Sequence, residues 1–258
     1  MRKLFILSLC LICLGSLSAQ KKKIKVATVG NSLTGGNKDF GFYGMPLAEM
    51  LGDGYEVQKF GKGASGIFIK LREDATTEEN PNEYKFAYIN SEECAAAVAY
   101  NPDIVVIKFG ANDANRKLFD KYGKDVFKDD YKKLINKFRN LPTNPDIYVC
   151  LTPPMFYGEG GFMGSFDDDA ANEFIRPAVR EIAEELNLKC VDLYTPLKNH
   201  KEYMPGGMDW VHPDHRGQYI IAREVFKAIT GSFVMNPGGV TIPASDISLS
   251  GSKDRKSV

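Results

Sequence analysis

Four short polar segments contain the residue types from which hydrolytic active sites are built. They are Gly-Asn-Ser-Leu-Thr at 30–34, Gly-Ala-Ser-Gly at 63–66, Gly-Ala-Asn-Asp at 110–113 and Asp-Trp-Val-His-Pro at 209–213. Ser32 in the first segment is a weak nucleophile unless a neighbouring base takes its proton. His212 in the last segment is a candidate base. It follows Asp209 by three residues, a spacing that lets the carboxylate hold one ring nitrogen while the other faces the serine.

Attack by a serine on an ester also requires donors for the negative charge that develops on the carbonyl oxygen. Three donors are candidates for this oxyanion hole: the backbone N–H of Ser32, the backbone N–H of a glycine in the second segment, and the side-chain amide of Asn112. An asparagine suits this task because its amide donates without ionising. The run GKGASG leaves Gly63 and Gly66 as alternatives for the glycine, and we favour Gly66.

The elements that must position these residues alternate along the chain. Apolar, β-branched runs predict strands at 24–29, 55–60, 103–109, 146–151 and 189–194. Helical patterns lie between or after them, at 43–51, 91–100, 125–141, 172–186 and 217–229. This alternation predicts an α/β fold with a parallel sheet covered on both faces. Because ligands bind beyond the carboxyl ends of such strands, we expect the four polar segments to meet at one edge.

Taken together and in this order, the four segments resemble the sequence blocks of the SGNH (GDSL-type) hydrolases, and most of all those of carbohydrate and sialate O-acetylesterases. The family's functional positions fall on Ser32, Gly66, Asn112, Asp209 and His212. The resemblance spans residues 26–229. It implies a three-layer α/β/α sandwich with a mostly parallel, flavodoxin-like sheet, and hydrolysis of O-acyl esters without a metal or another cofactor. Asn31 departs from the aspartate in the family's name, and the second block carries an extra glycine.

Other interpretations of the same segments are weaker. The run GKGASG matches a dinucleotide-binding fingerprint, but no strand ending in an acidic residue follows about 20 residues later. The run at 30–37 lacks the lysine of a phosphate-binding loop. Asp209, His212 and His215 could ligate a metal, but His200 is the one further histidine. The chain has no Gly-X-Ser-X-Gly elbow of the α/β-hydrolases.

The two ends of the chain differ in composition from the rest. Residues 1–19 combine a basic start, an apolar run at 4–17 and small residues before Gln20, which is typical of a signal peptide. We therefore expect an exported protein, periplasmic or secreted, without stable membrane insertion after cleavage; an uncleaved anchor is the alternative. Residues 20–231 would form the hydrolase domain, and 232–258, rich in Gly, Ser and Pro, a flexible tail or linker remnant.

Charge and cysteine content narrow the possible partners. The chain has 33 basic and 33 acidic residues, so its composition shows no preference for nucleic acid. Cys10 and Cys13 would leave with the signal peptide. Cys94, Cys150 and Cys190 are expected to be small buried apolar residues, although one disulfide is possible. The sequence leaves the oligomeric state open.

Aromatic residues near the expected site favour an acylated glycan over a long-chain lipid as substrate. These residues are Tyr43, Phe156, Tyr157, Phe162 and Trp210. Aromatic faces stack on sugar rings, although the same residues could equally belong to the core. The predicted function is hydrolysis of O-acetyl esters on carbohydrate. The alternatives are a lysophospholipase or short-chain acyl esterase acting on small molecules, and a non-catalytic sugar-binding protein of the same fold.

Overall fold

The computed structural model describes residues 22–36, 41–69, 87–158, 166–205 and 210–231. The expected signal peptide, the C-terminal tail, Phe162 and Asp209 lie outside these ranges. So does most of the polar segment at 71–90. No helix within the described ranges is long and apolar enough to cross a membrane.

Five parallel strands form one sheet in the order β2-β1-β3-β4-β5, which is the flavodoxin-like order. The strands are β1 (Ile24–Gly30), β2 (Tyr55–Gly61), β3 (Ile104–Lys108), β4 (Asp146–Cys150) and β5 (Lys189–Val191). The α/β class and the parallel sheet predicted from the sequence are confirmed. The strand at 189–194 ends early because the carboxylate of Asp192 accepts the N–H groups of Tyr194 and Thr195 and turns the chain.

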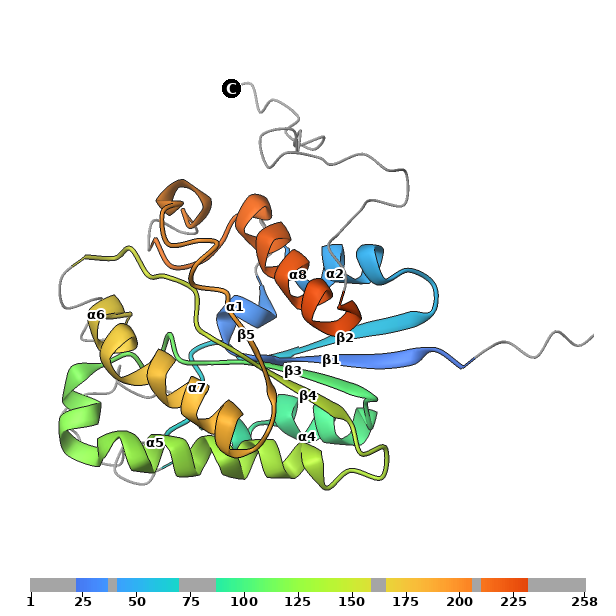
Figure 1. Ribbon diagram of the computed structural model, residues 1–258, viewed down its shortest axis with the longest axis horizontal. Helices are drawn as coiled ribbons and strands as arrows, with labels where there is room; N and C mark the ends of the chain where they lie inside the picture. Colours follow the sequence, from blue (N-terminus) through green and yellow to red (C-terminus); the bar gives the residue numbers. More distant parts are fainter. Residues whose placement is uncertain (1–21, 37–40, 70–86, 159–165, 206–209, 232–258) are drawn as a thin grey trace, which may run out of the picture.

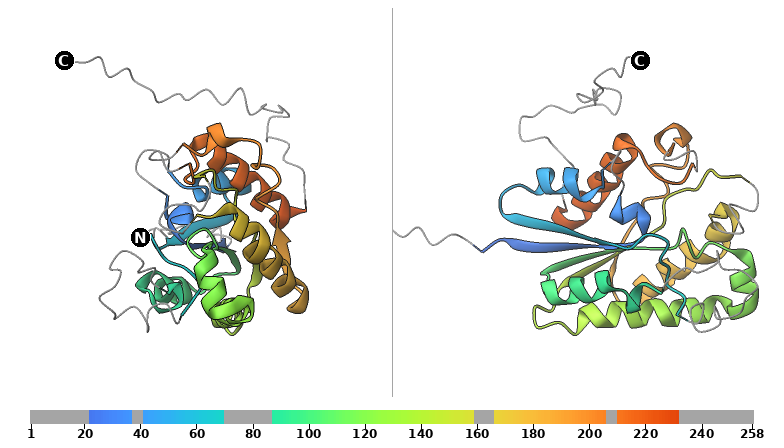
Figure 2. Two further views of the ribbon diagram at one scale, coloured as in Figure 1. Left: turned by 90° about the vertical axis from the view of Figure 1, so that its left-hand side faces the viewer. Right: turned by 180° about the vertical axis from the view of Figure 1, so that it is seen from behind.

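Helices cover both faces of the sheet (Figures 1 and 2). One layer holds α4 (Glu92–Tyr100), α5 (Arg116–Arg139) and α7 (Arg176–Glu185), and the other holds α1 (Ser32–Gly35), α2 (Gly44–Leu51) and α8 (His215–Thr230). The connections between these elements contain four short helical segments: η2 (Tyr88–Asn90), α6 (Asp168–Ala170), η3 (Ala171–Ile175) and η4 (Lys201–Tyr203).

The alternation of side chains along the strands divides the interior into two cores. Val29 and Ile107 pack into the core under α4, α5 and α7, whereas Val26 and Val106 pack into the core under α2 and α8. β3 is buried along its whole length because it lies in the middle of the sheet with helices on both faces. The continuous apolar run at 104–107 therefore reflects a strand that has no exposed face.

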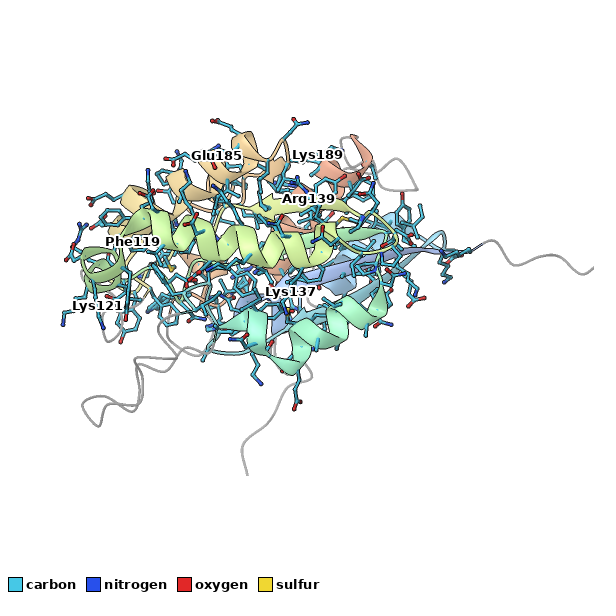
Figure 3. The ribbon with its side chains drawn as sticks, turned by 90° about the horizontal axis from the view of Figure 1, so that it is seen from below. Phe119, Lys121, Lys137, Arg139, Glu185 and Lys189 are labelled. Carbon is cyan, nitrogen blue, oxygen red and sulfur yellow. The ribbon has the colours of Figure 1, made fainter. Side chains whose placement is uncertain are left out.

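The longest helix begins nine residues before the predicted start at 125. Asn115 caps α5 by accepting the N–H of Lys117 at 3.0 Å, and the chain then kinks at Gly123, whose φ is 81°. The sequence predicted a start at 125 because the helical spacing of apolar residues begins only after the kink. Figure 3 shows α5 from outside, with Phe119 near one end and Lys137 and Arg139 near the other. Basic residues near a helix C-terminus stabilise the helix by interacting with its dipole.

Ion pairs connect α5 to α7 on the outer surface. Lys128 contacts Glu181 at 2.8 Å and Glu185 at 2.6 Å. Lys124 also pairs with Glu181, and Lys132 with Glu185. The lysines lower the pKa of Glu185 to about 2 by hydrogen bonding to its carboxylate. Exposed ion pairs contribute little singly, so the network mainly fixes the mutual register of the two helices.

The three cysteines of the described residues are free thiols. Cys94 and Cys150 are buried, as predicted. Cys190 is exposed, so the expectation of burial was wrong for this residue. It lies on β5, the edge strand of the sheet, where one side of the backbone has no neighbouring strand.

Candidate active site

Ser32 lies at the first turn of α1, directly beyond the carboxyl end of β1. Asn31 caps this helix by accepting the N–H of Leu33 at 3.0 Å. Gly30, the last residue of β1, allows the helix to fold back tightly, because a Cβ atom there would overlap the Thr34 side chain and the carbonyl oxygen of Lys108. The strand thus ends in a short turn that presents the serine at the edge of the sheet.

His212 approaches Ser32 from the other end of the chain. Its Nε2 lies 2.8 Å from Ser32 Oγ, although the two residues are 180 positions apart. The histidine precedes α8, whose start is fixed by Asp214: its carboxylate accepts the N–H groups of Arg216 at 2.9 Å and Gly217 at 3.1 Å. The 2.8 Å between His212 Nε2 and Ser32 Oγ is short enough for direct proton transfer between them. Asp209 lies outside the described residues.

The loops after β2 and β3, the two strands that flank β1, are bonded to each other. Asn112 is buried, and its Nδ2 donates to the carbonyl of Ser65 at 2.8 Å. The Oδ1 of Asp113 accepts the N–H of Ile67 at 2.7 Å. A Cβ on Gly66 would lie 2.5 Å from that same oxygen, so only glycine fits without a shift. Gly66 therefore has a packing reason for its identity, whatever else its N–H does.

Asp113 is a residue whose role the sequence analysis missed. It stands beside Asn112 in the motif, but nothing in its spacing indicates that it would bind the backbone of another loop. Its carboxylate holds the segment after β2 against the segment after β3. This is a tertiary contact between residues 46 positions apart, and such contacts leave no local periodicity.

Arg176 plays a similar structural part for the loop after β4. The buried guanidinium donates to the carbonyls of Thr152 at 3.0 Å and Pro153 at 2.9 Å, and pairs with Asp168 at 2.6 Å. Asp168 in turn accepts the N–H of Met155 at 3.0 Å. Charge-assisted bonds of this kind fix a loop in place.

The loop after β4 is connected to the segment that carries His212. The N–H of Phe156 donates to the carbonyl of Trp210 at 2.9 Å. Trp210 and Tyr157 are 37% and 38% exposed, respectively, so part of each side chain is accessible to solvent. Tyr43 is fully buried under α2 and α8, so its expected place at the rim was wrong. It is the N-cap residue of α2 and belongs to the core, which is the alternative that the sequence left open.

Beneath α1 lies a buried lysine that the sequence analysis also missed. Lys108 ends β3, and its ammonium is 5.3 Å from the centre of the Tyr43 ring. Its Nζ has no hydrogen-bond partner among the described residues. Burial lowers the pKa of this ammonium from 10.5 to about 7. Burial also raises the pKa of the Tyr43 hydroxyl.

Across the described ranges, no three His, Cys, Asp or Glu side chains gather closely enough to hold a metal ion. What the described geometry offers is a serine hydroxyl 2.8 Å from an imidazole nitrogen, directly beyond the carboxyl end of β1. This arrangement can activate an oxygen nucleophile.

Comparison with known proteins identifies the family. The model of the GDSL-like lipase/acylhydrolase family matches residues 28–220, which run from β1 into α8. The chain belongs to this family. An acetylxylan esterase of Xylanibacter ruminicola is 29% identical over 241 residues, covering 84% of this chain and 45% of that protein. The chain therefore spans less than half the length of this relative.

Solved structures share the fold at low sequence identity. Est24, a carbohydrate acetylesterase from Sinorhizobium meliloti, has a TM-score of 0.58 at 18% identity, covering 81% of this chain and 99% of its own. A lipase/acylhydrolase from Enterococcus faecalis has a TM-score of 0.56 at 20% identity, with 81% and 96% covered. The aryl esterase of M. smegmatis gives 0.56 at 16% identity, with 82% and 100% covered. These likenesses establish the SGNH hydrolase fold.

Proposed function

We propose that this protein is a serine esterase that removes O-acetyl groups from carbohydrate. The observation that carries the proposal is the 2.8 Å contact between Ser32 Oγ and His212 Nε2, in a chain of the GDSL-like lipase/acylhydrolase family. A serine hydroxyl in contact with an imidazole at the carboxyl edge of a parallel sheet is the arrangement needed for acyl transfer.

In the proposed reaction, His212 accepts the proton of Ser32 as Oγ attacks the carbonyl carbon of the acetyl ester. The negative charge that develops on the carbonyl oxygen is stabilised by the N–H groups of Ser32 and Gly66 and by Nδ2 of Asn112. Nδ2 of that amide donates to the carbonyl of Ser65 at 2.8 Å, which fixes the orientation of the side chain. Asp209 holds Nδ1 of His212 and stabilises the imidazolium.

The intermediate then collapses, and the sugar hydroxyl leaves with the proton that His212 carries. Water next attacks the acetyl-serine while His212 acts as base again, and acetate is released with Ser32 restored. Each step moves a single proton between Ser32, the imidazole and the leaving or attacking oxygen. No additional reactant besides water is needed.

Carbohydrate as the acyl carrier is supported by two independent lines. The relative from X. ruminicola is an acetylxylan esterase, and Est24 is a carbohydrate acetylesterase. In addition, Trp210 and Tyr157 are exposed on the segments that meet beside His212.

The test is the release of acetate from a panel of substrates by the purified protein. The panel contains acetylated xylo-oligosaccharides, ethyl acetate and a lysophospholipid, and the Ser32→Ala variant is the control. We expect the highest kcat/KM on the acetylated oligosaccharides and loss of activity in the variant. Preference for the lysophospholipid, or equal activity of the variant, would contradict the proposal.

A further inference from the structure

We propose that the indole of Trp210 is the surface on which a sugar ring of the substrate rests, so that this side chain determines the preference for glycan esters. The inference rests on the proposed function and deepens it by naming the residue that recognises the carbohydrate. Among the aromatic residues expected near the site, Tyr43 is buried, whereas Tyr157 and Trp210 are exposed, and Trp210 lies two residues before His212.

The position of Trp210 relative to the reacting groups is fixed from two sides. It precedes His212 by two residues, and His212 contacts Ser32. Its carbonyl accepts the N–H of Phe156 at 2.9 Å, which ties it to the loop after β4. That loop is itself held by the buried Arg176. We call the indole of Trp210 the platform. The segment that carries it is therefore bonded both to the loop after β4 and, through His212, to Ser32.

Exposed apolar surface also gathers at this place. Within the described ranges, the large hydrophobic residues that are exposed are Ile24, Met45, Tyr157 and Trp210. Tyr157 and Trp210 lie on the two segments that the Phe156–Trp210 bond joins. Two exposed aromatic residues therefore lie on segments that are bonded to each other, and one of these segments carries His212, which contacts Ser32. Exposed aromatic side chains in such a place mark a binding surface.

The backbone at Trp210 is strained, and the strain points to its side chain. Its φ is 53°, in the left-handed region. Glycine adopts this region freely and asparagine tolerates it, whereas a bulky side chain does so at a cost. A large aromatic residue held in an unfavourable conformation next to reacting groups is a sign of function.

The indole can attract a sugar ring without an ionic contact to it. The Lys201 ammonium lies 4.6 Å from the ring centre and helps to orient the ring. Arg216 pairs with Asp214 at 2.6 Å, and the His200 ring contacts Glu202 at 2.9 Å. An aromatic face carries partial negative charge, and the axial C–H groups of a pyranose carry partial positive charge, so the two attract without an ionic partner.

The chain contains a single tryptophan, which makes direct detection of binding possible. Intrinsic fluorescence of the Ser32→Ala variant is followed during titration with acetylated xylo-oligosaccharide, which this variant cannot turn over. We expect a saturable change in emission. The absence of any change at concentrations that saturate the wild-type enzyme would overturn the assignment of Trp210.

Activity of two variants provides an independent test. Trp210→Gly removes the ring and relieves the strained φ, whereas Trp210→Tyr keeps an aromatic face. For Trp210→Gly, we expect kcat/KM on acetylated xylo-oligosaccharide to fall at least about tenfold more than on ethyl acetate, mainly through KM. Trp210→Tyr should recover most of that loss. The ratio of the two substrates cancels any shared effect of the substitution on folding or on the catalytic groups.

The outcomes separate this inference from the proposed function. If the wild type releases acetate from glycans but the substrate ratio is the same in Trp210→Gly, the platform is refuted and the esterase stands. If the wild type releases no acetate from any glycan, the proposed function fails, and the role of Trp210 fails with it. A selective loss on the glycan, together with the emission change, supports both.

Discussion

Ser32 and His212 each have an ordinary residue type, and their contact is what gives them chemistry. A serine hydroxyl is unreactive at neutral pH until a base within hydrogen-bond distance accepts its proton, and Nε2 of His212 lies at that distance. The consequence is that the two residues should act as a unit. Removing either one should remove most of the activity that depends on the pair.

We therefore expect Ser32→Ala and His212→Ala each to lower kcat by about 10³- to 10⁶-fold, and the double variant to lose hardly more than either single variant. The measurement is acetate release from acetylated xylo-oligosaccharide. His215→Ala is the matched control, since it removes the neighbouring histidine at the start of α8. A loss below about tenfold in His212→Ala, or equal losses in the two histidine variants, would contradict the assignment.

Lys108 leads to a prediction about stability. The pKa of its ammonium is about 7 in the folded protein, against an ordinary value of 10.5. Between these two pH values unfolding takes up a proton, so the free energy of unfolding should rise as the pH is raised from 7 towards 10. Lys108→Met removes the buried amine and keeps an unbranched apolar side chain. It should raise stability at pH 7 and below, and reduce the rise at higher pH.

The measurement is urea unfolding of wild type and Lys108→Met at several pH values between 6 and 10. Lys137→Met, at an exposed position of α5, is the control and should leave the pH dependence unchanged. If Lys108→Met is less stable than wild type at pH 6, the contacts of the ammonium stabilise the folded protein by more than its burial destabilises it. That result would contradict the prediction.

At the scale of elements, the loops after β2 and β3 form one unit through Asp113 and Asn112. Gly66→Ala would place a Cβ 2.5 Å from Asp113 Oδ1 and push these loops apart. We expect a loss of about 1–3 kcal/mol in the free energy of unfolding. Activity should fall at least about tenfold, because Asn112 is carried by the displaced loop. Both quantities are measured on the same preparation.

Gly63→Ala is the matched control for this substitution. Gly63 is exposed, and an added Cβ would meet nothing within 4 Å. This variant should keep wild-type stability and activity. The opposite pattern, with Gly63→Ala impaired and Gly66→Ala normal, would transfer the oxyanion role to the first glycine of the pair.

The sequence predicts strands and helices where burial is periodic, and it fails where side chains make their own contacts. The buried run of β3 and the Ser91 cap of α4, which accepts the N–H of Cys94 at 3.1 Å, follow from local pattern. α1 is four residues long, too short for any periodicity. The kink at Gly123 and the turn at Asp192 arise from single residues inside longer runs.

The same distinction holds for the candidate site. Ser32 and His212 could be predicted because four polar segments occur in the order of the SGNH family's blocks, and a parallel sheet brings the loops after its strands to one edge. The roles of Asp113, Arg176 and Lys108 could not, since each depends on a partner distant in the sequence. The burial of Tyr43 could not be predicted either, because an aromatic residue that precedes a helix is common both at the rim of a site and in a hydrophobic core.

At the scale of the whole molecule, strand order explains where the site lies. The chain leaves β1 towards β2 on one side, and β3 continues to β4 and β5 on the other. The order of the strands therefore reverses between β1 and β3, and in open α/β sheets ligands bind at such a switch point. Ser32 follows β1 and Asn112 follows β3, so both stand at this point. His212 reaches it from the segment that precedes α8.

This meeting of the two halves of the chain is tested most directly by covalent labelling of Ser32. The protein is treated with a fluorophosphonate, which reacts with activated serines, and the modified peptide is identified by mass spectrometry. We expect one adduct on Ser32, no adduct in Ser32→Ala, and labelling of His212→Ala slower by at least about a hundredfold. Modification at a different serine, or an unchanged rate in His212→Ala, would contradict the central claim that this imidazole activates this hydroxyl.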